Sequence, residues 1–273
     1  MRKFYLQLEN GVRLDLNSED VFFSYPQGLG YESAADYTNI GGGFFLQAEA
    51  KERQSVITGD IVFASYGLYK DNAMYLDAAQ IVYAPEDVEY LRDIVIQSVG
   101  KGELDATGLL ICPVTILALS PWYTAQRRVL TMNPSAEIEK AKRYPYRYSY
   151  AYAYAGASGG ISVSAGGQQP SPVKVTMQGR VVNPVISLYR SGVLIGKAAP
   201  SVTVPEGSTL IYDSRPKNPG IWIDGVSVID ALSLDYPNFF EIPTNAACTL
   251  RISASAFFSS LVTIDIFDFY KVV

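Results

Sequence analysis

A chain of 273 residues, 48 % of them hydrophobic and 18 % charged, is long enough for two domains and too apolar to be a disordered segment. Its formal net charge of −5 offers no excess of Lys and Arg for nucleic-acid phosphates, and the absence of histidine excludes Ser-His-Asp triads and histidine-bound zinc or iron. The longest apolar run, Leu109 to Leu119, is too short to span a bilayer, and charges after Met1 interrupt any signal peptide, so we expect a soluble protein made in the cytoplasm, without membrane insertion.

The chain opens with two alternating segments, residues 3–9 and 12–16, on either side of Asn10-Gly11. This pattern predicts a hairpin with a tight two-residue turn. Further along, residues 44–51 and 55–64 flank the polar residues Glu52, Arg53 and Gln54. They predict a long hairpin arm near residues 44–63 with these three residues at its tip. Such a tip either contacts a neighbouring subunit or is an ordinary exposed hairpin, and the sequence favours neither.

A helix is predicted near residues 71–83, because Met74, Ala78 and Ile81 share one helical face and Pro85 ends the pattern. Strand-like segments follow, up to the sequence SPWY at residues 120–123. Residues 1–130 therefore predict a β-rich N-terminal domain with one packed helix. We interpret Trp122, with Tyr123 beside it, as a contact between domains or subunits.

Residues 131–273 begin with a polar connector, followed by YPYRYSYAYAYA at residues 144–155, which has a tyrosine at every second position. Period two places all the rings on one face of a strand. We favour a structural strand covered by a loop or a neighbouring subunit, with Tyr148 and Tyr150 as contact residues. Glycan contact through the rings and amyloid-like pairing are the weaker interpretations.

From residue 172 onward, eight or nine short strands alternate with turn residues such as Arg190-Ser191-Gly192 and Pro205-Glu206-Gly207. No helical pattern lies between them, so this part predicts an antiparallel β-sandwich. Trp222 lies in one of these strands and is equally suited to a surface contact and to the core.

Few sequence features point to chemistry. Cys112 and Cys248 are far apart and flanked by apolar residues, which predicts buried, unpaired thiols. The sequence GASGG at residues 156–160 matches the Gly-x-Ser-x-Gly elbow, but no helix pattern and no histidine accompany it. We therefore expect no catalytic residue, no metal site and no cofactor, although a pair of carboxylates for glycoside hydrolysis is not excluded by composition.

The order of several segments resembles one family, the distal tail protein (Dit) of phages with long, non-contractile tails. The resemblance covers nearly the whole chain and is carried by the tyrosine stretch and by these segments: PQGLGYESAADYTNIG, IVYAP, LSPWY, VVNPVISLY and NFFEIPTNAACTLRIS. It implies a mainly β fold, with a barrel-like N-terminal domain and then a galectin-like or carbohydrate-module-like sandwich. Galectin sugar sites use a histidine, so that sugar chemistry does not carry over to this chain.

The resemblance also implies a role in the virion. Members form a ring, usually a homo-hexamer, that surrounds a channel at the distal end of the tail and joins the tail tube protein to tail-tip or receptor-binding proteins. Residues 1–130 hold 17 acidic and 10 basic residues. Their negative charge would repel DNA phosphates if enough of the carboxylates face the channel.

Three classes of function stay open at this point. The first is a structural hub, which predicts a closed ring in solution. The second is a carbohydrate-binding module that adheres to a bacterial cell surface, which predicts glycan binding lost on replacing exposed Tyr or Trp residues. The third is a glycosidase with two carboxylates, which predicts hydrolysis of cell-wall polysaccharide.

Overall fold

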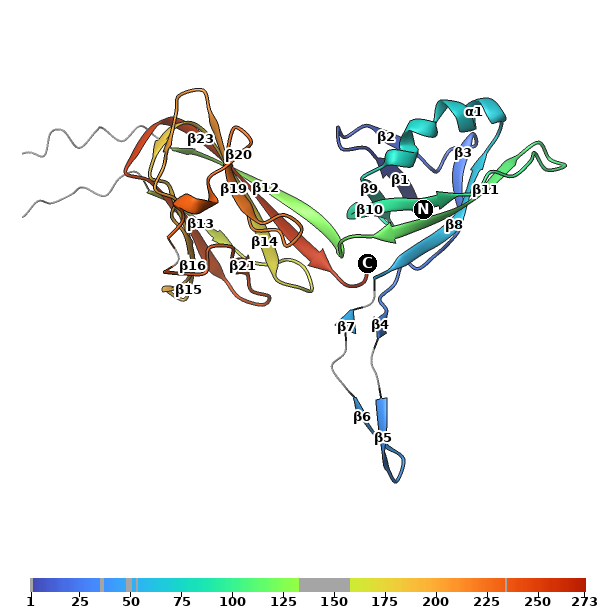
Figure 1. The fold of residues 1–273 in the computed structure, drawn as a ribbon, viewed down its shortest axis with the longest axis horizontal. Coiled ribbons are helices and arrows are strands. Elements are labelled where there is room, and N and C mark those ends of the chain that lie inside the picture. The colour runs from blue at the N-terminus through green and yellow to red at the C-terminus, as the bar shows by residue number, and fades with distance from the viewer. Residues whose placement is uncertain (1, 35–36, 48–50, 53, 133–157, 234) are drawn as a thin grey trace, which may run out of the picture. The chain divides into compact units, whose positions relative to one another are not determined.

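The computed structural model describes residues 2–34, 37–47, 51–52, 54–132, 158–233 and 235–273. The chain divides into two compact units, unit 1 with residues 1–124 and 270–273, and unit 2 with residues 125–269. We expected the division after residue 130; it falls between Thr124 and Ala125. Antiparallel strands dominate both units (Figure 1).

Unit 1 is an antiparallel barrel-like sheet in which β10 belongs to two ladders, β2–β1–β9–β10–β12 and β3–β8–β11–β10. An isolated bridge between Asn17, just after β2, and Phe22 of β3 links the two outer strands. The strands are β1 (Lys3–Gln7), β2 (Arg13–Asp15), β3 (Val21–Gln27), β8 (Val56–Phe63), β9 (Gln80–Ala84), β10 (Tyr90–Val99), β11 (Leu110–Ala118) and β12 (Trp122–Met132).

The core of unit 1 follows from alternation along these strands. In β11, Leu110, Cys112 and Val114 are buried, whereas Ile111 and Pro113 between them are exposed, as period two requires. The buried side chains of neighbouring strands form one apolar cluster that also includes Trp122. This cluster fixes which face of β3, β8, β11 and β10 is turned outward.

The helical part of unit 1 differs from the expected helix near residues 71–83. Helix α1 spans Tyr66–Asp71, and a 3₁₀ helix spans Ala73–Asp77. The Ser65 side chain accepts a hydrogen bond from the Leu68 backbone N–H at 3.2 Å, so it is the N-cap that starts the helix. The predicted helix near residues 71–83 is therefore wrong: the α-helix ends where the predicted one begins, residues 73–77 form only a 3₁₀ helix, and residues 80–84 form strand β9.

The first hairpin is confirmed, but not its two-residue turn. β1 pairs with β2 from Tyr5–Asp15 to Gln7–Arg13. The Leu8 N–H then donates to the Val12 carbonyl, which leaves three residues in the loop. Gly11 has a φ of 84°, so the position needs a residue that adopts the left-handed region without strain.

Between β3 and β8 lies a segment that we call the arm, residues 33–52. It holds β4 (Ser33–Ala34), β5 (Tyr37–Gly41), β6 (Phe44–Gln47) and β7 (Lys51–Glu52). β4 pairs with β7, and β5 pairs with β6. The turn of this hairpin is therefore at Gly41–Gly43. This corrects the expected arm near residues 44–63, because Glu52 pairs with Ser33 and β8 pairs with β3 and β11.

Unit 2 is an antiparallel sandwich, as predicted, with one large apolar core. One sheet has the order β12–β23–β14–β18–β19–β20, with β17 and β21 also paired to β14, and the other has the order β13–β22–β15–β16. Its elements are β13 (Ser158–Val163), β14 (Ser171–Val182), β15 (Val185–Arg190), β16 (Val193–Ala198), β17 (Thr203–Val204), β18 (Thr209–Asp213), β19 (Gly220–Ile223), β20 (Val226–Ser227), a 3₁₀ helix (Ile229–Ala231), β21 (Glu241–Ile242), β22 (Cys248–Ser253) and β23 (Ala256–Tyr270). The tyrosine stretch lies outside the described residues.

The last strand belongs to unit 2 up to Phe269, and the chain then returns to unit 1. Tyr270 and Val273 pack against the core of unit 1, and the ring of Tyr270 meets Tyr90 edge-on at 5.2 Å. Unit 1 is therefore made from two separate stretches of sequence.

The two cysteines are buried and unpaired, as predicted, with Cys112 in unit 1 and Cys248 in unit 2. Burial raises the pKa of both thiols, which lowers the fraction of reactive thiolate. We expect neither thiol of the native protein to react with iodoacetamide at pH 8 within the time that labels a denatured sample completely. Peptide mass spectrometry measures each cysteine separately, so the labelling also reports the unfolding of each unit. Fast labelling of either thiol in native buffer would contradict this expectation.

In the described part of the chain, every helix is too short or too polar to cross a bilayer.

Candidate functional site

The described residues contain no group of three or more His, Cys, Asp or Glu able to hold a metal ion. Ser158 and Gly160 of the Gly-x-Ser-x-Gly match lie in strand β13, and Gly156 lies outside the described residues. A nucleophile elbow needs a sharp turn from a strand into a helix, which β13 does not provide.

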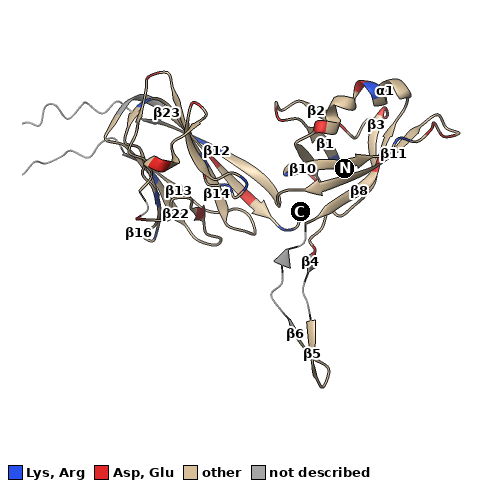
Figure 2. Cartoon of the chain, in the orientation of Figure 1, with Lys and Arg blue, Asp and Glu red and all other residues tan. Residues whose placement is uncertain are grey.

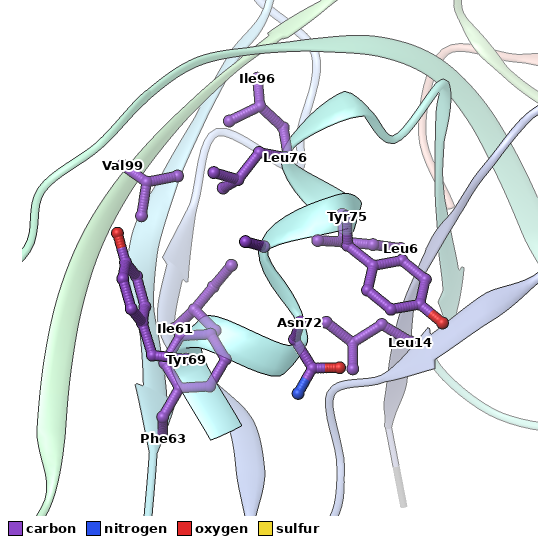
Figure 3. Close-up of a pocket in the computed structure, with 11 residues that line it drawn as sticks. Leu6, Leu14, Ile61, Phe63, Tyr69, Asn72, Tyr75, Leu76, Ile96 and Val99 are labelled. Carbon is purple, nitrogen blue, oxygen red and sulfur yellow. The ribbon is translucent and has the colours of Figure 1, made fainter. Parts of the chain in front are cut away.

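A small cleft in unit 1 lies beside α1 and the 3₁₀ helix (Figure 3). Its lining is almost wholly apolar and consists of Leu6, Leu14, Ile61, Phe63, Tyr69, Asn72, Ala73, Tyr75, Leu76, Ile96 and Val99. The amide Nδ2 of Asn72 already donates to the Leu68 carbonyl at 2.8 Å, and the Tyr75 hydroxyl donates to the Arg13 carbonyl at 3.2 Å. A binding site for a polar ligand needs several convergent polar groups, so this cleft is better explained as imperfect packing under the helix.

The most unusual surface of unit 1 is the arm tip, which we define as Tyr37, Ile40, Phe44 and Phe45. These four side chains are between 62 and 71 % exposed, although exposed apolar residues in soluble proteins are usually scattered. Gly41, Gly42 and Gly43 between them all have positive φ, and Asn39 Oδ1 accepts a hydrogen bond from the Gly41 N–H at 2.8 Å. The turn is thus specified by local chemistry, while the apolar side chains around it are uncovered.

The two ends of the arm are held by buried polar contacts. Before the arm, the Leu29 carbonyl accepts a hydrogen bond from the indole Nε1 of Trp122 at 3.2 Å. After it, the Ser55 hydroxyl accepts one from the Arg92 guanidinium at 2.9 Å, and the Ser55 carbonyl accepts one from the Ala118 N–H at 3.0 Å. The arm therefore leaves the barrel from two fixed points.

Arg92 at this position is a buried cation. Its Nε donates to the Ser120 carbonyl at 2.8 Å, and its guanidinium lies 5.2 Å from the ring centre of Trp122. Burial lowers the pKa of Arg92 to about 10, because the charged form loses its hydration. Among the residues that the structure describes, none is a hydrogen-bond partner of its Nη1 atom.

The structure places the predicted contact residues in different surroundings. Trp122 and Tyr123 are core residues of unit 1, because the Trp122 side chain is only 1 % exposed and Tyr123 is also buried. Our interpretation of this pair as a contact surface is therefore wrong. Tyr123 joins a hydrogen-bonded group in which its hydroxyl donates to Asp93 at 2.9 Å and lies 2.5 Å from Gln80 Nε2.

The other predicted contact residues lie in both units. Gln54 is exposed, but its Nε2 donates to the Ala118 carbonyl at 3.1 Å. Trp222 is half-buried on β19, with its ring over Gly220. Only the backbone of Glu52 is described, and Arg53, Tyr148 and Tyr150 lie outside the described residues. The arm tip was missed, although three glycines between Ile40 and Phe44 were a readable turn signal.

A second candidate surface is the outward side of the ladder β3–β8–β11–β10, which we call the neutral face. Cross-strand pairs such as Val56–Leu117 and Leu117–Val95 show that its side chains form rows across the four strands. It consists of Phe22, Ser24, Val56, Thr58, Asp60, Val62, Val95, Ser98, Ile111, Pro113, Thr115 and Leu117. Val62 within this set is only 4 % exposed, whereas Val56, Val95 and Ile111 are at least 40 % exposed. Asp60 is the single charged residue of this set.

Comparisons with known proteins agree on one kind of phage protein. The family model of the distal tail protein N-terminal domain matches residues 3–119. A phage P2 baseplate protein, solved in the activated conformation with Ca, is 12 % identical with a TM-score of 0.67 and full coverage of both chains. The same baseplate with Sr gives 12 % identity and a TM-score of 0.66, again with full coverage.

The Dit protein of phage SPP1, described as a paradigm of the hub adsorption apparatus of phages that infect Gram-positive bacteria, is 9 % identical. Its TM-score is 0.58, and the match covers 97 % of this chain and 98 % of that one. No curated protein matches the chain. At such low identities these structures show the fold, and the predicted mainly β fold is confirmed for the residues that the structure describes.

Proposed function

Because residues 3–119 match the model of the distal tail protein N-terminal domain, we propose that the chain is a phage distal tail protein and forms the ring-shaped hub at the end of the tail. In this proposal six copies surround the channel through which DNA leaves, and the hub joins the tail tube protein to tail-tip or receptor-binding proteins. The protein is assembled in the host cytoplasm and acts as a building block that transforms no substrate.

The observation that carries the proposal is the arm tip. Four large apolar side chains exposed on a hairpin that has few partners of its own need a protein surface to cover them. A subunit that assembles around an axis provides such a surface in each neighbouring copy.

The acidic residues of unit 1 support the part of the proposal in which the ring surrounds a channel for DNA. Its carboxylates include the exposed residues Asp15, Glu19, Asp20, Glu86, Asp87 and Glu89, and Figure 2 shows Asp and Glu on several of the loops of this unit. Acidic loops around a channel would keep DNA phosphates from binding to its wall.

Negative-stain electron microscopy and native mass spectrometry of the purified chain test the proposal. We expect an annulus with a central hole and the mass of six 29.9 kDa chains. A ring that dissociates on dilution is expected to reappear when the tail tube protein of the same phage is added. Single chains under all these conditions would exclude the ring.

A further inference from the structure

We propose that unit 2 binds a neutral polysaccharide of the bacterial surface through the outer side of its sheet β23–β14–β18–β19, with Trp222 as the platform for one sugar ring. We call this side of the four strands the Trp222 face. The inference takes from the proposed function only the position at the end of the tail. It does not depend on the ring, because each copy carries the whole site within unit 2.

Strand alternation turns the Trp222 face away from the core. One row of cross-strand pairs is fully buried in the sandwich core and consists of Ile221, Tyr212, Val175 and Ile264. Trp222 follows Ile221 in β19, so its side chain points to the opposite side of the sheet. The row that contains Trp222 is half-buried and consists of Trp222, Ile211, Thr176 and Thr263.

The indole ring of Trp222 lies over Gly220, which precedes it by two residues on the same side of β19. A Cβ atom at position 220 would lie only 2.4 Å from the ring atoms Cη2 and Cζ2, so a glycine is needed beneath the ring. The side chain is half-buried, and part of the ring is therefore open to solvent. An aromatic surface held in this way suits the C–H groups on one face of a sugar ring.

Charged groups of alternating sign form the row next to the ring. This row consists of Gly220, Asp213, Lys174 and Asp265 in cross-strand register. Asp265 continues the alternation through its ion pair with Arg127 at 2.7 Å. Hydrogen-bond acceptors and donors thus alternate across the sheet. Because sugar hydroxyls both donate and accept, a neutral sugar matches this row better than a polymer that carries charge of one sign.

One ion pair of this row is already ordered without a ligand. The Asp213 side chain is 6 % exposed, and its Oδ2 accepts hydrogen bonds from Arg215 Nε at 3.0 Å and Nη2 at 2.7 Å. The guanidinium also packs over the ring of Phe267 at 4.6 Å, while 34 % of the Arg215 side chain is exposed. Polar groups that are ordered in advance lose little conformational entropy on binding, which favours a ligand held by several weak contacts.

The same charged row favours a sugar over a protein as the occupant. The centre of a protein interface is usually depleted of charged residues, because each buried charge gives up its hydration. Asp213, Lys174 and Asp265 would lie close to the centre of any protein contact made around Trp222. Sugar hydroxyls and the water around them can replace the hydration of these groups. The proposed position at the end of the tail brings the face to a surface where polysaccharides are abundant.

Binding of the full chain to surface polysaccharide from the bacterium that the phage infects tests the inference. The polysaccharide is treated with protease and separated by anion exchange into a neutral and a charged fraction. We expect the neutral fraction to bind in biolayer interferometry and to change the tryptophan fluorescence. Trp222 is the expected source of that change, because Trp122, the only other tryptophan, is buried in unit 1.

Three variants locate the site. Trp222→Ala removes the platform and is expected to weaken binding about tenfold or more. Gly220→Ala displaces the ring, removes no polar group and is expected to weaken binding as well. The matched control Gly160→Ala adds the same methyl group to the other sheet, where its nearest neighbour would lie 3.6 Å away, and is expected to bind like the wild type. All three variants are expected to keep the circular dichroism spectrum of the wild type.

Wild-type affinity in both Trp222→Ala and Gly220→Ala would overturn the inference. It would also be overturned if only the charged fraction bound, or if the protease treatment abolished binding, since the ligand would then be an anionic polymer or a protein. None of these results touches the proposed hub. If the chain forms no ring but the neutral fraction binds through Trp222, the ring fails and this inference stands.

Discussion

Replacing Asp268 with alanine is expected to lower the free energy of unfolding of unit 2 by about 3 kcal/mol. The Asp268 carboxylate is fully buried and accepts three hydrogen bonds, from the Gly166 N–H at 2.8 Å, the Ser171 hydroxyl at 2.7 Å and the Gln126 amide at 2.6 Å. These donors come from the loop before β14, from β14 itself and from β12. Without the carboxylate, buried donors lose their acceptor, and each such loss costs about 1–3 kcal/mol.

Urea unfolding measured through the labelling of Cys248 reports this effect, because that thiol lies in unit 2. Asp268→Asn keeps an oxygen at the site and is expected to cost less than half as much. Asp265→Ala is the matched control, since Asp265 binds Arg127 at 2.7 Å, and the Arg127 side chain is 70 % exposed. The Asp265 side chain is only 12 % exposed, but its partner is largely solvated, so loss of this ion pair is expected to cost less than loss of the three hydrogen bonds of Asp268. Equal urea midpoints of unfolding for Asp268→Ala and the wild type would contradict the stabilising role of the Asp268 carboxylate.

Replacing Trp122 with alanine is expected to destabilise unit 1 by about 4 kcal/mol, the usual cost of removing a large buried aromatic ring. The ring of Trp122 lies 5.8 Å from that of Tyr83, and its indole N–H holds the Leu29 carbonyl at the start of the arm. The Arg92 guanidinium packs over the same ring. The substitution therefore creates a cavity and releases one of the two fixed ends of the arm.

Labelling of Cys112 in increasing urea measures the loss of free energy of unfolding, because this thiol lies in unit 1. Trp222→Ala serves as the control, because Trp222 is half-buried and lies in unit 2. It is expected to cost about 1–2 kcal/mol and to leave the labelling of Cys112 unchanged. If Trp122→Ala and Trp222→Ala had equal effects on Cys112, Trp122 would not be the core residue described here.

Local chemistry predicts much of unit 2. The turn Ser191-Gly192 lies between β15 and β16, and both residues have positive φ, as a tight hairpin turn requires. Gly207 before β18 also has positive φ. Where a turn depends on residues that adopt special backbone angles, the sequence carries the information within a few positions, so these strands were predicted in the correct order.

The wrong predictions, for the helix near residues 71–83 and for Trp122, have a physical reason in common. Ile81 and Val82 are both fully buried, so β9 is covered on both faces and its sequence lacks the alternation of a half-exposed strand. Its apolar residues also fit a helical face together with Met74 and Ala78, which produced the wrong helix. Similarly, nothing close to Trp122 in sequence shows that Leu29 and Arg92 bury it, because that pocket forms only when distant strands pair.

The return of residues 270–273 to unit 1 makes unit 2 an insertion within the chain of unit 1. During synthesis the ribosome must produce all of unit 2 before Tyr270 and Val273 can complete the core that they share with Tyr90. A nascent chain therefore carries an unfinished barrel until its sandwich has been translated.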